Sequence, residues 1–170
     1  LMVDCDPTGA LTTSFGINPK AGEKTVYHAL LERGTSLRET IRKVRDNLHL
    51  VPAERDLAAA EILLIQQPGG EFALQKALRE VEAEYSYILL DCPPNLGKLT
   101  VNALAAAAGV VIPMTPAYLS LNPMGQLMET IETVRDRLNP KLRLLGLLLT
   151  QFNRRVLHAA EVEEHLRKTY

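Results

Sequence analysis

The chain has 170 residues, of which 46% are hydrophobic and 23% are charged, a size and composition typical of one globular domain with a substantial core. Its net charge of −1 gives no general attraction to nucleic acid or to an anionic membrane, so such binding would need a local patch. The two cysteines, Cys5 and Cys92, are too few for a disulfide scaffold, and we interpret them as free thiols. The longest apolar run, residues 103–114, is too short to span a bilayer. We expect a cytoplasmic protein without membrane association.

The first half of the sequence alternates short apolar runs with helical periods. Ser36 and Glu39 have the spacing of a capping box, which predicts that a helix starts at residue 37. Gly34 is a suitable C-cap for the helix before it. The predicted elements are a strand at 1–3, helices at 25–33 and 37–44, a strand at 48–51 and a helix at 54–66.

The second half continues this alternation and defines the fold class. Residues 87–91 form a continuous apolar run, typical of a strand buried on both faces of a parallel sheet. The other predicted elements are helices at 72–85, 100–107 and 123–138, strands at 109–113 and 142–150, and a last helix from 156. This order indicates an α/β fold with a doubly wound, mostly parallel sheet flanked by helices and right-handed crossovers. No linker divides the chain, so we predict a single domain over residues 1–170.

Acidic residues stand at two predicted strand ends, where open α/β sheets bind ligands. Asp91 ends an apolar strand, and a carboxylate there could hold Mg²⁺ through water beside a phosphate site. An aspartate before prolines could equally be a turn former. Asp4 and Asp6 are two residues apart, so on an extended backbone they point to the same side. They would repel each other without a cation between them, which favours a metal or nucleotide site.

The usual phosphate cradle, a glycine-rich loop ending in Lys-Ser or Lys-Thr, is missing from the sequence. The pair at 69–70 has no lysine after it, and Gly97-Lys98 is followed by Leu99 rather than by a hydroxyl residue. A nucleotide site would therefore need phosphate ligands from elsewhere.

Several motifs occur together in an order that resembles one known family. Residues 3–9 are similar to the Val-Asp-x-Asp-Pro-Gln-Gly segment of ParA and Soj proteins, which are deviant Walker ATPases. Residues 89–97 resemble their Walker B and switch II segment, and 99–104 continue that signature. Residues 112–127 and 148–155 follow in family order, so the resemblance covers essentially the whole chain. The Asp-Cys-Pro-Pro block distinguishes the ParA branch from the related MinD branch.

The resemblance implies roles for the three acidic residues. Asp6 would orient the attacking water near the γ-phosphate of ATP, Asp4 would support the Mg²⁺ shell, and Asp91 would be the Walker B carboxylate. The implied fold is that of the P-loop NTPases, and the implied cofactors are ATP and Mg²⁺.

The resemblance also implies a switch segment and a base pocket. Pro93, Pro94 and Gly97 would belong to switch II. Asn153 stands where relatives contact the adenine edge, which an amide can do because it both donates and accepts, although it could equally be a strand-end turn residue. Pro113 would help to shape the base pocket.

The sequence departs from the family pattern at several positions and at its start. Thr8, Ala10, Ala117 and the pair 122–123 differ from the common residues, which puts base contacts and dimer communication in doubt. The family's first strand and phosphate-binding loop should precede Leu1. We therefore expect the sequence to be a piece cut at both ends, inactive alone, and assign the function to the parent protein.

The function implied is an ATP-driven partition switch. ATP would promote a homodimer that binds DNA non-specifically, and a ParB-type partner would stimulate hydrolysis, which implies association with the nucleoid. A MinD-like membrane-positioning ATPase and a non-catalytic scaffold without a phosphate loop are the alternatives. A basic patch could contact DNA, but interleaved acidic residues favour a mixed-charge solvated face; its candidates are Arg135, Arg137, Lys141, Arg143, Arg154 and Arg155.

Overall fold

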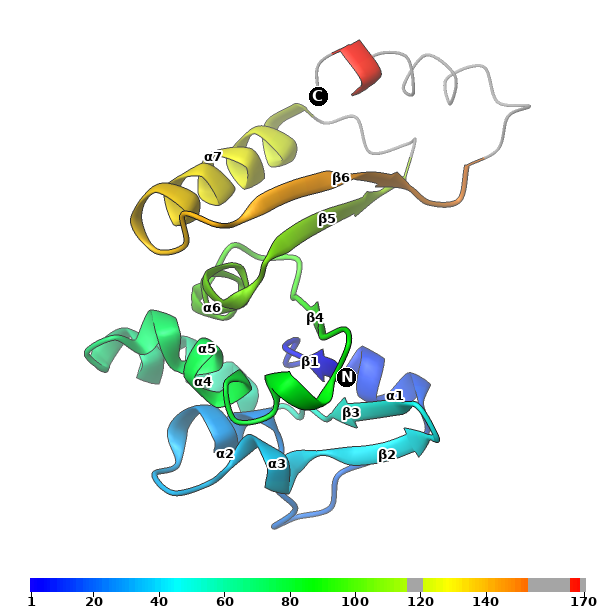
Figure 1. The fold of residues 1–170 in the computed structure, drawn as a ribbon, viewed down its shortest axis with the longest axis vertical. Helices are drawn as coiled ribbons and strands as arrows, with labels where there is room; N and C mark the ends of the chain where they lie inside the picture. The colour runs from blue at the N-terminus through cyan, green and yellow to red at the C-terminus, as the bar shows by residue number, and fades with distance from the viewer. Residues whose placement is uncertain (116–120, 153–165, 169–170) are drawn as a thin grey trace. The chain divides into compact units, whose positions relative to one another are not determined.

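The structure is a computed structural model that describes residues 1–115, 121–152 and 166–168, without the side chains of 121–123. It divides into two compact units, Leu1–Ala107 and Ala108–Tyr170 (Figure 1). The single domain that the sequence predicts stays a prediction. Within the described residues, no helix is both long and apolar enough to cross a membrane.

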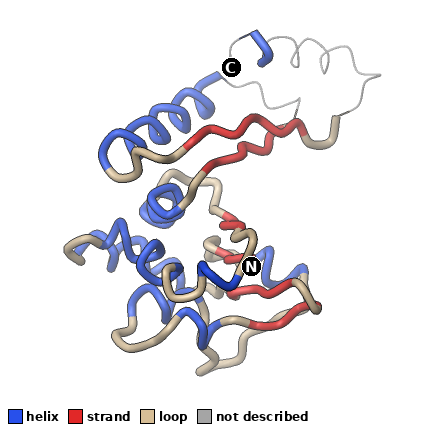
Figure 2. The backbone as a smooth tube through the Cα atoms, viewed as in Figure 1, coloured by secondary structure: helices blue, strands red, loops and turns tan. Residues whose placement is uncertain are grey.

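The first unit is built on a four-stranded sheet with the order β2-β3-β1-β4, labelled in Figure 1, and strands are drawn in red in Figure 2. Its strands are β1 (Met2–Asp4), β2 (Arg42–Arg45), β3 (Leu48–Val51) and β4 (Leu89–Asp91). β1 pairs in parallel with both β3 and β4, and only β2 runs antiparallel to its neighbour. The parallel strands of the α/β fold are thereby confirmed, and their carboxyl ends meet at one edge of the sheet.

Helices and the sheet enclose one apolar core in this unit. The helices are α1 (Ala10–Ser14), α2 (Val26–Leu31), α3 (Leu37–Thr40), α4 (Leu57–Gln66), α5 (Ala73–Leu78) and α6 (Lys98–Ala106), with 3-10 turns η1 (Gly70–Phe72) and η2 (Glu82–Glu84). Side chains from the strands and helices are fully buried together: Val3, Val26, Leu37, Val51, Leu57, Leu64, Leu74 and Leu99. Burial of each such side chain stabilises the fold by about 1.5–3 kcal/mol.

The second unit contains a parallel strand pair joined through a long helix. β5 (Gly109–Met114) pairs with β6 (Arg143–Leu149), and α7 (Leu121–Arg137) lies between them in sequence. Parallel neighbours need such a crossover, because a tight turn can join only antiparallel strands. The sequence-based prediction of strand, long helix and strand is confirmed here. The last predicted helix, from residue 156, lies largely outside the described residues.

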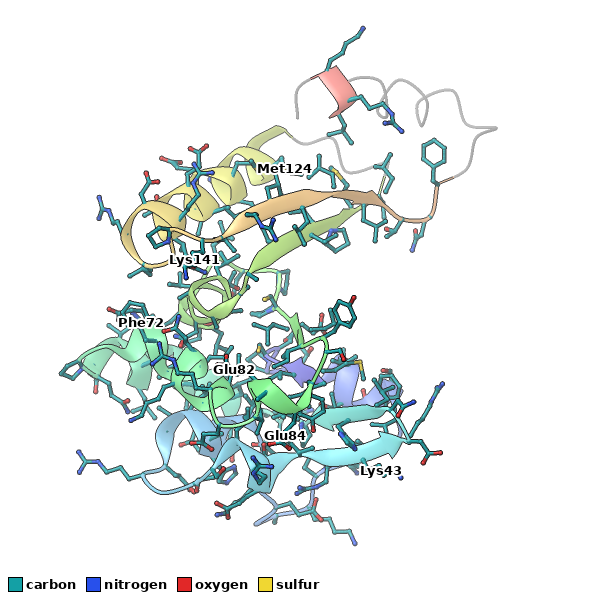
Figure 3. All side chains as sticks on the ribbon, in the orientation of Figure 1. Lys43, Phe72, Glu82, Glu84, Met124 and Lys141 are labelled. Carbon is teal, nitrogen blue, oxygen red and sulfur yellow. The ribbon has the colours of Figure 1, made fainter. Side chains whose placement is uncertain are left out.

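The predicted helix at 37–44 is wrong in its second half. The capping box is present, since Ser36 N donates to the Glu39 carboxylate at 2.9 Å. The helix nevertheless ends at Thr40, and Ile41 has extended backbone angles. Residues 42–45 then form β2, which pairs with β3. Strand pairing outweighs the weak local helix preference of a short segment. On the surface of this hairpin, Lys43, which is labelled in Figure 3, pairs with Asp46.

Two other sequence-based boundaries are corrected by the structure. Helix α2 ends at Leu31, and its C-cap is Glu32 rather than Gly34, which instead has a positive φ of 87° in the turn beyond. The helix predicted at 72–85 is divided into α5 and η2. Both differences shorten a helix, because the ends of short helices fray into turns.

The prediction that residues 87–91 are buried on both faces is also wrong. Leu90 packs against the core. Tyr87 and Leu89, by contrast, are 82% and 65% exposed. Side chains alternate between the two faces of a strand, so β4 presents Leu90 to the core and Leu89 to the opposite face, which the described core does not cover. Val111 of β5 and Leu148 of β6 are likewise exposed in the second unit.

A buried asparagine on α6 joins this helix to the segment before α5. The Asn102 side chain is 1% exposed and donates to Gly70 O at 2.8 Å and Lys98 O at 3.1 Å. Its Oδ1 accepts from Leu74 N at 3.1 Å. All polar atoms of the amide are thus used inside the fold.

We predict that Asn102→Ala lowers the free energy of unfolding by about 2–3 kcal/mol, because the Leu74 N–H and the Gly70 carbonyl lose their buried partner. Urea denaturation measures this loss. Thr130→Ala is the control, since Thr130 is bonded only within α7 and should cost less than about 0.5 kcal/mol. Equal losses in the two variants would contradict the structural account of Asn102.

Candidate functional site

Acidic side chains gather at the carboxyl edge of the four-stranded sheet. Asp4 and Asp91 are register partners in the parallel pair β1 and β4, so they leave the sheet on the same face. Cys5 N donates to Asp91 O at 2.8 Å, which extends the pairing by one residue. Asp6 follows at the start of the next loop. Sequence reasoning placed these three residues at strand ends, and the structure brings them to one edge.

Asp4 is the buried centre of a hydrogen-bond network. Its side chain is inaccessible to solvent, and Oδ2 accepts from Thr12 N at 2.9 Å and Thr12 Oγ1 at 2.6 Å. Oδ1 accepts from Asp6 N at 3.1 Å. Thr12 Oγ1 in turn accepts from Ala53 N at 3.0 Å. Hydrogen bonds to a carboxylate are stronger than neutral ones, so this network fixes the loop after β1 against the end of β3.

Asp6 lies on that fixed loop and stays partly exposed. Its Oδ1 accepts from Thr8 N at 2.8 Å, and its carbonyl accepts from Gly9 N at 2.9 Å, which closes a tight turn. Gly9 has a φ of 63°, and a Cβ there would lie 3.2 Å from Ala53 O. The turn therefore favours glycine for both conformation and space. It presents the Asp6 carboxylate at the edge, where water and ligands can reach it.

The environment at this edge changes the pKa of Asp91. Partial burial, followed by the nearby charges of Asp4 and Asp6, raises the pKa of Asp91 above its ordinary value. In the part of the chain that the structure describes, none of these three carboxylates forms a salt bridge with a lysine or arginine. A cation at this edge would relieve the repulsion.

The donor set fits Mg²⁺ that keeps much of its water. Across residues 1–115, 121–152 and 166–168, no three His, Cys, Asp or Glu side chains converge to form a complete metal site. Mg²⁺ characteristically needs only one or two carboxylates, with waters and substrate phosphates completing its shell. Asp91 is much more accessible to solvent than Asp4 and is available for this, whereas the oxygens of Asp4 already accept three protein hydrogen bonds. The part of Asp4 in the Mg²⁺ shell stays a prediction.

The segment after Asp91 is the predicted switch. Pro93 is buried, Pro94 is exposed and Gly97 is half-buried. Asn95 organises the turn, since its Oδ1 accepts from Gly97 N at 3.2 Å and its carbonyl accepts from Thr100 Oγ1 at 2.7 Å. The segment thus runs from the carboxylate edge directly into helix α6.

Two residues in this unit were missed by sequence reasoning. Thr12 binds Asp4, and Glu61 of α4 binds the first amides of α6, Lys98 N at 2.5 Å and Leu99 N at 3.4 Å. Each contact joins segments that are separate in the sequence. The only local signal for either residue in the sequence is a hydroxyl side chain in the first helical turn after Asp4 and Asp6. It indicates Thr12, and nothing comparable indicates Glu61.

The remaining predicted residues do not join this edge in the described structure. Pro113 is exposed on β5 of the second unit, and Asn153 lies outside the described residues. Their roles in base binding stay predictions. Of the basic candidates, Arg135, Arg137, Lys141 and Arg143 are exposed, and Arg154 and Arg155 lie outside the described residues.

The two cysteines are free, as expected from the sequence. Burial raises the pKa of the Cys5 thiol well above its ordinary value, and the neighbouring Cys92, Asp4 and Asp91 add to the shift. The neutral form of the Cys5 thiol is therefore favoured at its buried position directly after β1.

We predict that Thr12→Val lowers the free energy of unfolding by about 1–3 kcal/mol, because valine has the same shape but leaves Ala53 N–H and one Asp4 oxygen short of a partner. Urea denaturation is the measurement. Thr13→Val is the matched control, since the Thr13 hydroxyl bonds only to carbonyls of its own turn. If both variants lose the same stability, the Asp4 network does not hold the loop.

We predict that Asp91→Asn makes stability less dependent on pH. Because the pKa of Asp91 is raised in the fold, its contribution is greatest below the ordinary carboxyl pKa and is lost as the pH rises through the raised pKa. Between about pH 4 and pH 7 the variant should lose less stability than the unmodified protein. The gap in midpoint between the variant and the unmodified protein should therefore widen as the pH rises through this range. Thermal unfolding in EDTA at several pH values measures it, and parallel curves for the two proteins would refute it.

Comparison with known proteins places this edge in a family context. A family model described as "AAA domain" matches residues 1–144. The chain is 44% identical over 168 residues to the chromosome partitioning protein ParA of Myxococcus xanthus, covering 98% of this chain and 59% of that protein. It is 44% identical over 167 residues to the chromosome-partitioning ATPase Soj of Thermus thermophilus, covering 98% and 63%. The chain thus spans less than two thirds of the length of these relatives.

Solved structures agree with the sequence relatives. A Mycobacterium smegmatis protein described as cobyrinic acid a,c-diamide synthase, with bound ADP and magnesium, is 36% identical with a TM-score of 0.93, covering 99% of this chain and 69% of that one. A plasmid partition protein from Borrelia burgdorferi, at 24% identity and a TM-score of 0.82, shares the fold, covering 99% of this chain and 73% of that one. The matched domain, the relatives along nearly the whole sequence and the order of the carboxylate strand ends converge on one assignment: the chain belongs to the ParA/Soj-type family of partition ATPases.

Proposed function

We propose that the complete protein carrying this chain is an ATP-hydrolysing switch that partitions DNA. The observation that carries the proposal is the edge where Asp4, Asp6 and Asp91 gather, in a chain whose relatives are named as partition ATPases. The related structure with ADP and magnesium supports nucleotide and Mg²⁺ as the ligands of this fold.

The three carboxylates at this edge have different roles in the proposed reaction. Asp6 is partly exposed on a fixed turn. Its carboxylate can therefore accept a hydrogen bond from a water molecule and orient that water for attack on the terminal phosphate. Asp91 holds a hydrated cation, and Asp4 holds the turn that carries Asp6. When bound, Mg²⁺ and ATP supply charge neutralisation and the phosphoryl group.

The phosphates need ligands beyond those in this sequence. The 170 residues contain no glycine-rich loop ending in Lys-Ser or Lys-Thr. We expect the 170-residue chain alone not to hydrolyse ATP, because carboxylates without amide and lysine donors repel phosphate rather than bind it.

On the pattern of this family we propose a partition cycle for the complete protein. ATP promotes a homodimer, the dimer binds DNA without sequence preference, and a ParB-type partner stimulates hydrolysis and release. Exposed basic residues at the end of α7 and the start of β6 are available for phosphate contacts, although Arg135 also lies 3.9 Å from Asp136. The protein acts at the nucleoid in this proposal.

A second candidate comes from the related Mycobacterium smegmatis structure, whose description names a cobyrinic acid a,c-diamide synthase at 36% identity. Both candidates use ATP and Mg²⁺, so the carboxylate edge does not separate them. DNA retention that depends on ATP favours the partition switch, whereas ATP turnover that requires a carboxylic acid substrate and an amide donor favours the synthase.

We predict that Asp6→Ala in the complete protein reduces ATP turnover by about 10²-fold or more, because the attacking water loses its acceptor, while ATP affinity changes by less than about threefold. Steady-state hydrolysis and equilibrium nucleotide binding are measured on the same preparation. Thr8→Ala is the control, since Thr8 binds Asp6 only through its backbone N–H. Hydrolysis at the unmodified rate in Asp6→Ala would remove Asp6 from the mechanism.

A further inference from the structure

Helix α6 begins directly after the switch segment, residues 93–97, and another helix supplies its cap. Glu61 of α4 accepts from Lys98 N at 2.5 Å through Oε2 and from Leu99 N at 3.4 Å through Oε1. The first N–H groups of a helix have no partner within the helix, and a carboxylate there is also favoured by the helix dipole. Glu61 therefore fixes the point at which the switch segment passes into α6.

The residue before α6 explains why the cap comes from a distance. Gly97 is the N-cap, a position where Ser, Thr, Asp or Asn usually supplies the capping oxygen. Its φ of −78° and ψ of −169° are extended angles that any residue can adopt, so the conformation does not require glycine. A Cβ at residue 97, however, would lie 2.6 Å from both oxygens of Glu61. Glycine at this position makes room for the Glu61 carboxylate.

The body of α6 is anchored independently of this cap. Leu99 is buried in the core, and Asn102 binds Gly70 O and Leu74 N. At its other end, the segment leaves β4 at Asp91, which is held by the sheet. The switch segment is thus a short connection between two fixed elements. The Glu61 cap determines where its second end lies.

We propose that Glu61 is a positioning residue for ATP hydrolysis, holding the switch segment through the start of α6 in line with the carboxylate edge. The proposal rests on the ATPase function proposed above. Glu61 acts on the backbone amides of residues 98 and 99 rather than on nucleotide. A displacement of the segment by about 1 Å slows the chemical step much more than it weakens ATP binding.

Two variants disturb the same contact from opposite sides. Glu61→Ala removes the capping carboxylate, and Gly97→Ala pushes it away by collision. Glu61→Gln keeps one acceptor oxygen with nearly the same shape and should restore part of the effect. Glu71→Ala is the matched control, because in the described structure Glu71 pairs with the Lys98 side chain at 3.3 Å and not with the backbone amides of α6.

Hydrogen exchange in the complete protein without nucleotide is the first measurement, because it does not depend on hydrolysis. Exchange at the amides of residues 98 and 99 should rise roughly tenfold in Glu61→Ala and Gly97→Ala and stay unchanged in Glu71→Ala. Equal exchange in Glu61→Ala and the unmodified protein overturns the proposal.

Steady-state ATP hydrolysis is the second measurement. In Glu61→Ala and Gly97→Ala, kcat should fall about tenfold, whereas KM for ATP should stay within about twofold. The kcat of Glu61→Gln should lie between those of these two variants and that of the unmodified protein. Faster exchange with unchanged kcat would make Glu61 a structural cap only, which overturns its positioning role. An unmodified protein that hydrolyses no ATP refutes the proposed function, and the positioning role in catalysis falls with it. The exchange measurement then still shows whether Glu61 holds the segment.

Discussion

The buried Asp4 carboxylate is the interaction on which the geometry of the site depends. Burial of a charge is costly unless donors satisfy it, and here Thr12 and the Asp6 amide do so. Those same donors belong to the loop after β1, and Thr12 also reaches the end of β3 through Ala53 N. The need to satisfy one carboxylate thus fixes the turn that carries Asp6. Positioning of Asp6 follows from the folding of the core rather than from ligand binding.

A second constraint comes from like charges at the same edge. Partial burial, followed by the charges of Asp4 and Asp6, raises the pKa of Asp91, and the pairing of β1 with β4 holds Asp4 and Asp91 close in spite of their repulsion. The buried network around Asp4 and the parallel pairing of β1 and β4 supply the stability that keeps them together. This repulsion is already present in the fold and favours cation binding, because the bound ion relieves it.

The sequence predicted the parts of the fold that local patterns determine. The strands at the starts of the two acidic segments, the capping box at Ser36 and the grouping of three carboxylates at strand ends all follow from periodicity and topology. Strand β2 was missed because pairing with β3 decides its conformation. Thr12 and Glu61 were missed because their partners lie 8 and 37 residues away, in segments that only the folded chain brings together.

The two loops of the carboxylate edge are anchored by the same physical device. In each, a carboxylate binds backbone N–H groups: Asp4 accepts from the amides of Asp6 and Thr12, and Glu61 accepts from those of Lys98 and Leu99. Both contacts are made in the protein alone, so the loops need not be ordered by nucleotide before catalysis. Groups that are already in place do not have to reorganise, at a cost in free energy, as charge develops in the transition state. The difference lies in exposure: the Asp4 anchor is fully buried, whereas Glu61 is half-buried on α4. The Glu61 contact with the second loop can therefore be broken at lower cost than the Asp4 contact with the first.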